Sequence, residues 1–452
     1  MKKIRIGSGA GYAGDRIEPA VELMEKGNLD YIIFECLAER TVAIGQQDKE
    51  KDPSKGYNQL LDYRMEKILP LMAKNKVKVI TNMGAANPVS AAERTCEIAR
   101  KLGVSGLKIA CVTGDDITDE LDKYENEKVL EDGTLLKKKK DVLISANVYM
   151  GAEGITKALE EGANLVITGR VSDPALTIGP LVHEFGWNIT DNPDQMGQAV
   201  LAGHLLECGG QGAGGNYMYD WRNVPRMDEL GFPIAELTDD TFEITKAPDC
   251  GGIICEQSCK EQFLYEVHDP ANYLTPDVNV DISHATITQV GDNRVRIGGV
   301  KGKPRPDTLK LCVGYHKGWK TVSMLSFAWP DAYEKAQYCA EVIMKKMQRR
   351  GMKADDIHIS YIGLNSLHLG VADMSEEALK NLNECVLRIA VFSEDKSECA
   401  KIIPEISPMQ LNGPPGASFF GGRARVQEVM ALWPTTVPRD AVQVESHILE
   451  VK

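Results

Sequence analysis

The chain has 452 residues, 43% of them hydrophobic and 26% charged, and it carries a net charge of −13. This balance is typical of a globular protein, and the length exceeds what one hydrophobic core supports, so we expect two or three domains. The negative charge repels phosphate backbones and anionic lipids, which argues against nucleic acid or a membrane surface as a partner.

The sequence carries no signal peptide or membrane-spanning pattern. The N-terminus turns glycine-rich at Gly7 without an apolar core, and no later run reaches about 18 apolar residues. Eleven cysteines, an odd number, favour free thiols. Cys250, Cys255 and Cys259 fit neither a common zinc nor an iron–sulfur spacing, so we expect half-buried thiols along a pair of strands. These features together predict a cytoplasmic protein.

Short β-branched runs alternate with helical patterns over the first half of the chain, which indicates βαβ units around a mostly parallel sheet. The expected strands cover residues 3–7, 30–35, 77–81, 108–112, 143–149 and 164–168. The expected helices cover residues 16–26, 58–73, 89–102, 155–161, 175–185 and 194–206. A charged segment at 124–141, with lysines at 137–140, interrupts this rhythm and is expected to form a solvated hairpin.

Beyond residue 206 glycine and proline become frequent and the apolar runs shorten to strand length, which places a domain boundary near residue 225. Residues 1–225 are expected to form a Rossmann-like parallel α/β domain with helices on both faces. Residues 226–452 are expected to form a smaller α+β domain, with antiparallel strands over 241–327 and later elements at 331–349, 358–362 and 386–392. The Gly/Pro-rich stretch 411–425 predicts an irregular loop that lies over a site.

Polar or glycine-rich clusters follow nearly every expected strand of the first half. They cover residues 7–16, 35–39, 82–87, 114–116, 151–154 and 169–173. Ligands of open α/β sheets bind outside the carboxyl ends of the parallel strands. The sequence therefore predicts one small-molecule site to which these six loops contribute.

Residues 9–14 read Gly-Ala-Gly-Tyr-Ala-Gly between an expected strand and helix, with Glu35 closing the next strand. This is the dinucleotide fingerprint, in which Gly11 and Gly14 allow a close approach to pyrophosphate and the acid binds ribose. Asp15 follows directly, however, and an anion there competes for the same amides. A glycine turn capped by Asp15 is the structural alternative.

Two arginines are candidates for holding an anion. Arg16 opens the first expected helix, and Arg170 lies between an expected strand and helix, where it can present a two-point fork to a carboxylate or phosphate. Helix capping by Ser172 or Asp173 is the alternative explanation of the second segment.

His204, Glu207 and Cys208 share one face of an expected helix, just before a glycine-rich stretch. Imidazole, carboxylate and thiol on one face favour acid/base chemistry or a metal site, and a partly buried polar stripe at a helix end is the alternative. Asp115 and Asp116 are candidates for a divalent cation, although capping explains them equally well.

Eight ordered segments resemble the acyclic terpene utilisation AtuA family and span nearly the whole chain. The matching segments are Gly11-Tyr12-Ala13-Gly14-Asp15-Arg16, Leu37-Ala38-Glu39, Asn82-Met83-Gly84 with Asn87-Pro88, Gly114-Asp115-Asp116, Thr168-Gly169-Arg170 with Asp173, Gly203-His204-Leu205-Leu206-Glu207-Cys208, Gly251-Gly252, and Tyr273-Leu274-Thr275-Pro276-Asp277-Val278. The resemblance implies a role in the breakdown of acyclic terpenes, whose acids are processed as coenzyme A esters. It also implies that longer relatives carry a further C-terminal domain, for which we expect a small companion subunit or a homo-oligomer here.

Our leading hypothesis is an enzyme that hydrates, dehydrates or isomerises an organic acid or its coenzyme A ester. The binding residues would be Gly11, Gly14, Asp15, Arg16, Asn82, Asn87, Arg170 and Asp173. The catalytic residues would be Glu35, His204, Glu207 and Cys208. The alternatives are an NAD(P)-dependent oxidoreductase and a non-catalytic binding or assembly subunit.

Overall fold

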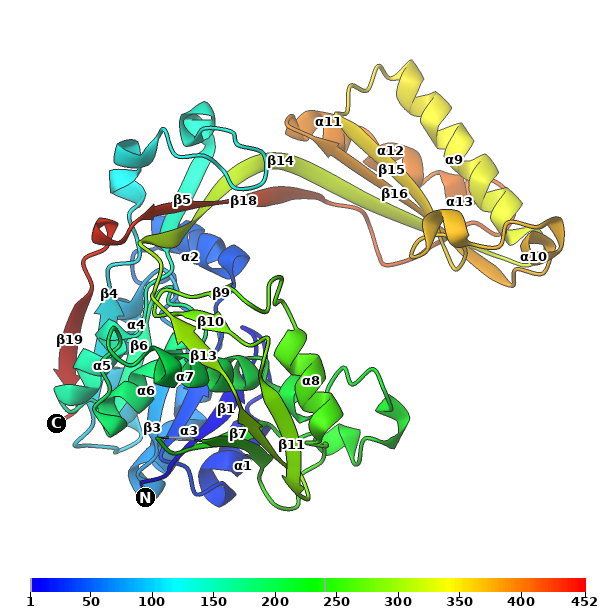
Figure 1. The fold of residues 1–452 in the computed structure, drawn as a ribbon. Coiled ribbons are helices and arrows are strands. Elements are labelled where there is room, and N and C mark those ends of the chain that lie inside the picture. Colours follow the sequence, from blue (N-terminus) through cyan, green and yellow to red (C-terminus); the bar gives the residue numbers. More distant parts are fainter. Residues whose placement is uncertain (1, 240) are drawn as a thin grey trace. The chain divides into compact units, whose positions relative to one another are not determined.

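The computed structural model describes residues 2–239 and 241–452, apart from the side chains of Lys139 and Lys140. The predicted exposure of the lysines at 137–140 therefore lies partly outside the described residues. The chain divides into two compact units (Figure 1). Unit 1 comprises Met1–Gly314 and Leu432–Lys452, and unit 2 comprises Tyr315–Ala431. Unit 1 therefore continues well past residue 225, where the sequence predicts a boundary.

A ten-stranded sheet forms the centre of unit 1, in the order β11-β12-β8-β7-β1-β2-β3-β6-β4-β19. Its five central strands run parallel, namely β1 (Ile4–Ala10), β2 (Tyr31–Phe34), β3 (Lys78–Thr81), β6 (Leu165–Thr168) and β4 (Lys108–Thr113). The flanking strands run antiparallel, namely β7 (Pro233–Leu237), β8 (Phe242–Lys246), β12 (Arg294–Gly298), β11 (Thr286–Gly291) and β19 (Glu445–Glu450). The sheet is thus mixed, and the predicted parallel sheet is only its central part.

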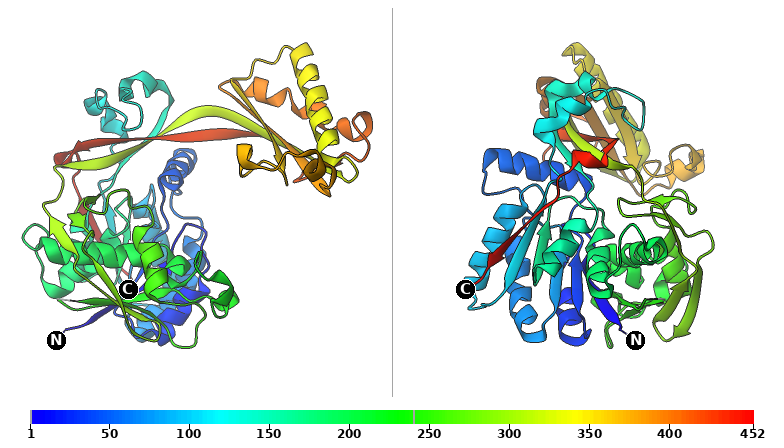
Figure 2. Two further views of the ribbon diagram at one scale, coloured as in Figure 1. Left: turned by 45° about the vertical axis from the view of Figure 1, so that its right-hand side comes forward. Right: turned by 60° about the vertical axis from the view of Figure 1, so that its left-hand side comes forward.

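Helices cover both faces of this sheet (Figures 1 and 2), as the sequence predicts. Successive side chains of a strand point to opposite faces, so Tyr31 and Ile33 join one core while Ile32 and Phe34 join the other. The first core contains α5 (Glu153–Glu160), α6 (Ala175–Phe185) and α7 (Pro193–Glu207). The second contains α1 (Glu18–Lys26), α3 (Leu61–Asn75) and α4 (Pro88–Lys101).

Strand β5 (Leu143–Val148) was expected in the parallel sheet, and that prediction is wrong. It pairs instead with β14 (Thr308–Ala328), and the N–H of Tyr149 just beyond it donates to Lys310 O at 2.9 Å. The parallel strands leave no free edge, because β7 pairs with β1 at one end and β19 pairs with β4 at the other. The preceding segment holds 3-10 turns η1 (Thr118–Tyr124) and η2 (Leu136–Val142), with one antiparallel bridge between them.

Two further helices were not expected. They are α2 (Glu39–Lys51) and α8 (Glu256–Leu264). Cys255 caps α8 and Cys259 lies inside it, so the expectation that these cysteines follow a pair of strands is wrong. All eleven cysteines are free thiols. The remaining elements of unit 1 are the sheet β13 (Lys301–Lys303), β10 (Asn279–Asp281) and β9 (Tyr273–Leu274), and the 3-10 turns η3 (Gly209–Ala213), η4 (Trp221–Asn223), η5 (Met227–Glu229) and η7 (Arg439–Ala441).

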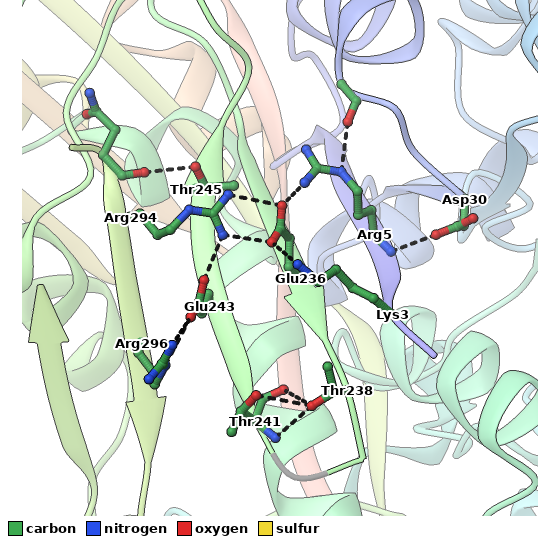
Figure 3. A network of polar contacts seen from close by, with 12 residues as sticks. Lys3, Arg5, Asp30, Glu236, Thr238, Thr241, Glu243, Thr245, Arg294 and Arg296 are labelled. Atoms are coloured by element: carbon green, nitrogen blue, oxygen red, sulfur yellow. Dashed lines mark hydrogen bonds and ion pairs between the residues drawn. The ribbon is translucent and has the colours of Figure 1, made fainter. Parts of the chain in front are cut away.

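A polar network joins β1 to the antiparallel strands beside it (Figure 3). The carboxylate of Glu236 is only 4% exposed and forms ion pairs with Lys3, Arg5 and Arg294. Arg294 also binds Glu243 at 2.7 Å. Two buried or half-buried acids thus neutralise the basic side chains that reach across these strands.

Unit 2 is built on the antiparallel sheet β15-β16-β14-β17, with β15 (Asp356–Ile362), β16 (Glu384–Ser393) and β17 (Ser418–Phe419). Helix α9 (Ala332–Arg349) packs against it and shares its hydrophobic core. The short helical elements are α10 (Glu376–Lys380), α11 (Lys396–Ala400), α12 (Ile403–Ile406), α13 (Met409–Asn412) and η6 (Leu369–Val371). Strand β18 (Val426–Pro438) pairs with β14, and both strands pass from one unit to the other.

Candidate functional site

The loops after β2 and β3 hold a buried acid. Glu35 accepts hydrogen bonds from the N–H of Leu37 at 2.8 Å and from Asn82 Nδ2 at 3.1 Å. Asn82 in turn accepts from the N–H of Cys36 at 2.7 Å, which fixes its amide orientation. Glu35 and Asn82, predicted separately from two strand ends, therefore belong to one polar cluster.

Arg170 follows β6 and is 1% exposed. Its guanidinium donates to the carbonyls of Leu37 and Val171 and forms an ion pair with Asp173, and it lies 4.4 Å from the ring centre of Tyr149. These contacts use four of its five N–H groups. Burial opposes its charge, but Asp173, Tyr149 and Glu35 outweigh burial and raise the pKa of Arg170. Arg170 thus ties three segments together and places a positive charge beside Glu35.

Asp115 binds the backbone of the loop after β6, at Arg170. Its Oδ2 accepts from the N–H of Arg170 at 2.9 Å and from Asn147 Nδ2 at 2.8 Å. Asp116 contacts Gln46 instead. Within residues 2–239 and 241–452 no group of three or more His, Cys, Asp or Glu side chains is arranged to hold a metal ion. The two aspartates are accounted for by these protein contacts.

His204 and Glu207 form a buried pair at the end of α7. Nδ1 of His204 lies 2.9 Å from Oε1 of Glu207, and the Tyr273 hydroxyl lies 3.5 Å from the same nitrogen. Gln262 donates to the carbonyl of His204 at 2.9 Å and holds the helix end. The other atoms of the pair, His204 Nε2 and Glu207 Oε2, have no partner among the described residues. The pair thus leaves one nitrogen and one oxygen whose hydrogen-bonding capacity these residues do not use.

The ionisable groups of the cluster have shifted pKa values. Burial, followed by the charge of Asp173, raises the pKa of Glu35 to about 8. Burial also raises the pKa of Glu207 to about 6, although His204 opposes the shift. For His204 burial lowers the pKa, but Glu207 outweighs burial and raises it. Because Asp173 influences both Glu35 and Glu207, the strand-end loops and the end of α7 form one electrostatic cluster.

The glycine-rich loop is closed by protein groups. The N–H of Gly11 donates to Asp15 Oδ2 at 2.8 Å, and a Cβ placed on Gly11 would lie 2.4 Å from the carbonyl carbon of Cys208. The fully buried Arg64 also contacts this loop, because its Nη2 donates to Asp15 O at 2.8 Å. Arg64 was not predicted, and its place on the apolar face of α3, beside Met65 and Ile68, is the only sequence signal for it.

Four predicted residues have other roles. Arg16 donates to Leu230 O and lies over the ring of Phe232. Asn87 caps α4 and donates to the carbonyls of Pro53 and Lys55, in the segment between α2 and α3. A Cβ placed on Gly14 would lie 3.1 Å from the ring of Tyr12. Burial raises the pKa of the Cys208 thiol to about 12, so a thiolate is disfavoured there.

Two residues near Arg170, Tyr149 and Lys310, were not predicted as site residues, whereas Glu39 belongs to the predicted cluster 35–39. The hydroxyl of Tyr149 donates to Glu39, and Lys310 Nζ lies 2.9 Å from the same carboxylate. Burial would raise the pKa of Glu39, but hydrogen bonds from Tyr149 and Lys310 lower it to about 2. This ionised group balances the positive charges of Arg170 and Lys310.

The fold and these residues define a mixed α/β protein that gathers buried ionisable groups at the carboxyl ends of its parallel strands. No helix within the described residues has both the length and the apolar character that a membrane span requires. The sequence model described as "Acyclic terpene utilisation family protein AtuA" matches residues 4–448. The chain belongs to this family, which confirms the resemblance drawn from the motifs. A comparison with curated proteins finds no match.

Proposed function

We propose that the chain is a cytoplasmic enzyme that isomerises, hydrates or dehydrates an organic acid or its coenzyme A ester by acid/base chemistry. The observations that carry the proposal are the buried pair of His204 and Glu207, each with one atom that has no partner among the described residues, and the buried carboxyl group of Glu35, whose pKa is raised to about 8. At neutral pH Glu35 holds a proton, and the pair of His204 and Glu207 can accept one. Neighbouring groups whose environments separate their pKa values are typical of acid/base sites.

In the proposed reaction the dyad removes a proton from the carbon next to the acyl carbonyl. His204 Nε2 or Glu207 Oε2 accepts this proton, and Glu35 donates one to another atom of the substrate. Arg170 favours the electron-rich intermediate through its positive charge. For a double-bond shift one proton leaves and one enters, so no oxidant is needed. The thioester bond stays intact throughout, so coenzyme A takes part only as the carrier portion of the substrate.

Proton exchange in D₂O tests this chemistry without knowledge of the net reaction. The purified chain is incubated with short branched-chain acyl and enoyl thioesters, and deuterium uptake beside the carbonyl is followed by mass spectrometry. We expect Glu35→Gln and His204→Gln to slow exchange by roughly 100-fold or more. His447→Gln, at an exposed histidine, is the matched control. Exchange at the native rate in both site variants would exclude the acid/base assignment.

The dinucleotide alternative has less support. The amide of Gly11 already donates to Asp15, and Glu35 accepts from Leu37 and Asn82 rather than facing a ribose position. Titration with NADH, followed by its fluorescence, separates the two functions. Saturable binding at millimolar or lower concentration would favour the oxidoreductase.

We also propose that the chain associates with copies of itself or with a small companion subunit. Leu411 is 93% exposed and Phe420 is 49% exposed, whereas Met409 is buried, so two large apolar side chains of this stretch face solvent. Exposed large apolar groups mark interaction surfaces when they gather in a patch. Light scattering and affinity capture with Leu411→Ser and Phe420→Ser test the proposal. A monomer that captures no companion would contradict the proposed association. If the Glu35 and His204 variants keep the biological activity, the chain is better described as a non-catalytic subunit.

A further inference from the structure

Unit 2 contains a cavity of about 250 Å³ that is separate from the residues of the strand-end cluster. Its walls come from β14, α12 and the loop that follows β17. The lining residues that matter here are Ser323, Met324, Ile403, Ile406, Phe419 and Arg423. Four of these six are apolar, while Ser323 and Arg423 are polar, and a second hydroxyl, from the exposed Ser407, also lines the cavity. A mainly apolar cavity with a few polar groups is the usual form of a small-molecule site.

Two of these polar groups, the Ser323 hydroxyl and the Arg423 guanidinium, lack partners among the described residues. Ser323 is 3% exposed, and its buried hydroxyl forms no hydrogen bond with any described residue. Arg423 is exposed, and within residues 2–239 and 241–452 it forms no ion pair or hydrogen bond. A buried hydroxyl without a partner is unfavourable unless a ligand or water satisfies it. The cavity therefore offers a hydrogen-bonding group and a positive charge that the protein itself leaves unused.

The backbone explains why a cavity forms at this place. Strand β17 pairs with β14 only at Leu325 and Ser326. The chain then turns away through Gly421 and Gly422, whose φ angles of 75° and 86° lie in the left-handed region that favours glycine. It rejoins the sheet as β18, which leaves the edge of β14 beside Ser323 without a neighbouring strand from β17. The loop 411–425, predicted to lie over a site, carries Arg423 to this cavity.

We propose that this cavity binds a small organic acid with an apolar body. A carboxylate is the ligand group that accepts hydrogen bonds from both an arginine and a serine hydroxyl. The apolar body lies against Ile403, Ile406 and Phe419. The volume lies just below the range of roughly 300–1,000 Å³ typical of small-molecule pockets, which limits the ligand to roughly ten non-hydrogen atoms.

Calorimetric titration of the full chain with octanoate tests the proposal, with octanol as the uncharged comparison. Arg423→Gln removes the cation from the cavity, and Arg425→Gln removes an exposed cation two residues away that does not line it. We expect Arg423→Gln to weaken octanoate binding about tenfold or more, and Arg425→Gln to change it less than twofold. Octanol should bind the native chain and the Arg423→Gln variant equally.

Hydrogen exchange identifies where octanoate binds. Bound octanoate should slow amide exchange in residues 403–407 and 418–424, and it should do so equally in the Glu35→Gln variant. That variant also separates this proposal from the catalytic one, since it removes proton exchange of thioesters while leaving octanoate binding intact. Equal affinity in Arg423→Gln and native protein, protection confined to the strand-end loops, or no binding up to about 10 mM would overturn the proposal.

Discussion

Glu35 is a carboxyl group that the fold keeps protonated. Burial gives it a pKa of about 8, against an ordinary value of 4.5. Between these two pH values the folded chain retains a proton that the unfolded chain has lost. The free energy of unfolding therefore falls as pH rises through this window, because ionisation favours the unfolded state.

We expect Glu35→Gln to remove this pH dependence. Glutamine keeps the oxygen that accepts from Leu37 and Asn82 but cannot ionise. Relative to the native chain, the variant should gain stability on the order of a few kcal/mol between about pH 5 and pH 8. Urea unfolding at several pH values measures the difference, with Glu445→Gln as the exposed control. A constant difference across this range would show that Glu35 is already ionised at pH 5.

The His204 pair makes a second prediction. Burial lowers the pKa of His204 and Glu207 raises it by a larger amount. We therefore expect Glu207→Gln to lower the imidazole pKa below its ordinary value, which an NMR titration of the histidine ring measures. Glu261→Gln on α8 is the control, since this carboxylate is not among the groups that shift His204. An unchanged pKa in Glu207→Gln would mean that the pair is broken in solution.

At the residue scale the sequence predicted polar groups that directly follow strands. Glu35, Asn82 and Arg170 could be anticipated because parallel strands end at one edge of a sheet. Tyr149 and Tyr273 could not, because β5 and β9 lie outside the central sheet and their contacts depend on long-range pairing. The burial of Arg64 could not be predicted. A charged residue among the apolar residues of a helix suggests an exposed position instead.

At the scale of elements, the end of α7 packs against the loop after β1. A Cβ on Gly11 would lie 2.4 Å from backbone atoms of Cys208, whereas a Cβ on Gly14 would meet only the Tyr12 ring at 3.1 Å. Tyr12 is exposed and can move aside. We expect Gly11→Ala to cost about 1–3 kcal/mol of stability and Gly14→Ala less than about 0.5 kcal/mol. Thermal unfolding of both variants measures this, and equal melting temperatures would contradict the close packing.

The network in Figure 3 supports a prediction for the antiparallel strands. Glu236→Gln removes the one charge that Lys3, Arg5 and Arg294 share, and leaves these cations without that partner. We expect a loss of about 1–2 kcal/mol, because three charge contacts are lost while the cations left behind are partly exposed to water. Denaturant unfolding measures it. A change below about 0.5 kcal/mol would mean that the basic groups find solvent or Glu243 instead.

The local patterns predicted helices better than strand partners. The helix expected at 175–185 matches α6, whose residues Ala175–Val182 are all buried. The position of β5 was also correct, but its pairing partner lies more than 150 residues away in β14 and leaves no local pattern. Helix α2 was missed because its sequence is largely polar and only a few of its residues are buried.

At the scale of the whole molecule, unit 2 is an insertion into unit 1. The N–H of Arg439 in η7 donates to the carbonyl of Asp307, just before β14, at 3.3 Å. Gly314 and Leu432 each lie seven residues along the chain from this bond, in the antiparallel sense. The two points where the chain leaves and re-enters unit 1 are therefore opposite each other on paired strands.

We expect unit 1 to fold without the insertion. Replacing residues 315–431 with Asn-Gly would close β14 and β18 as a two-residue hairpin, the turn that these residues favour. Circular dichroism and one cooperative thermal transition would show that the shortened chain is folded. A chain without a transition would mean that unit 2 is needed for the stability of unit 1.

The pairing of β19 with β4 has a consequence for synthesis on the ribosome. Until residues 445–450 emerge, the N–H and C=O groups along this side of β4 have no strand partner, and such an open edge invites association with other chains. Roughly 130 residues separate Gly314 from β19, so this interval lasts on the order of ten seconds at ordinary translation rates. Nascent chains stalled within unit 2 should consequently bind chaperones more strongly than chains released after β19.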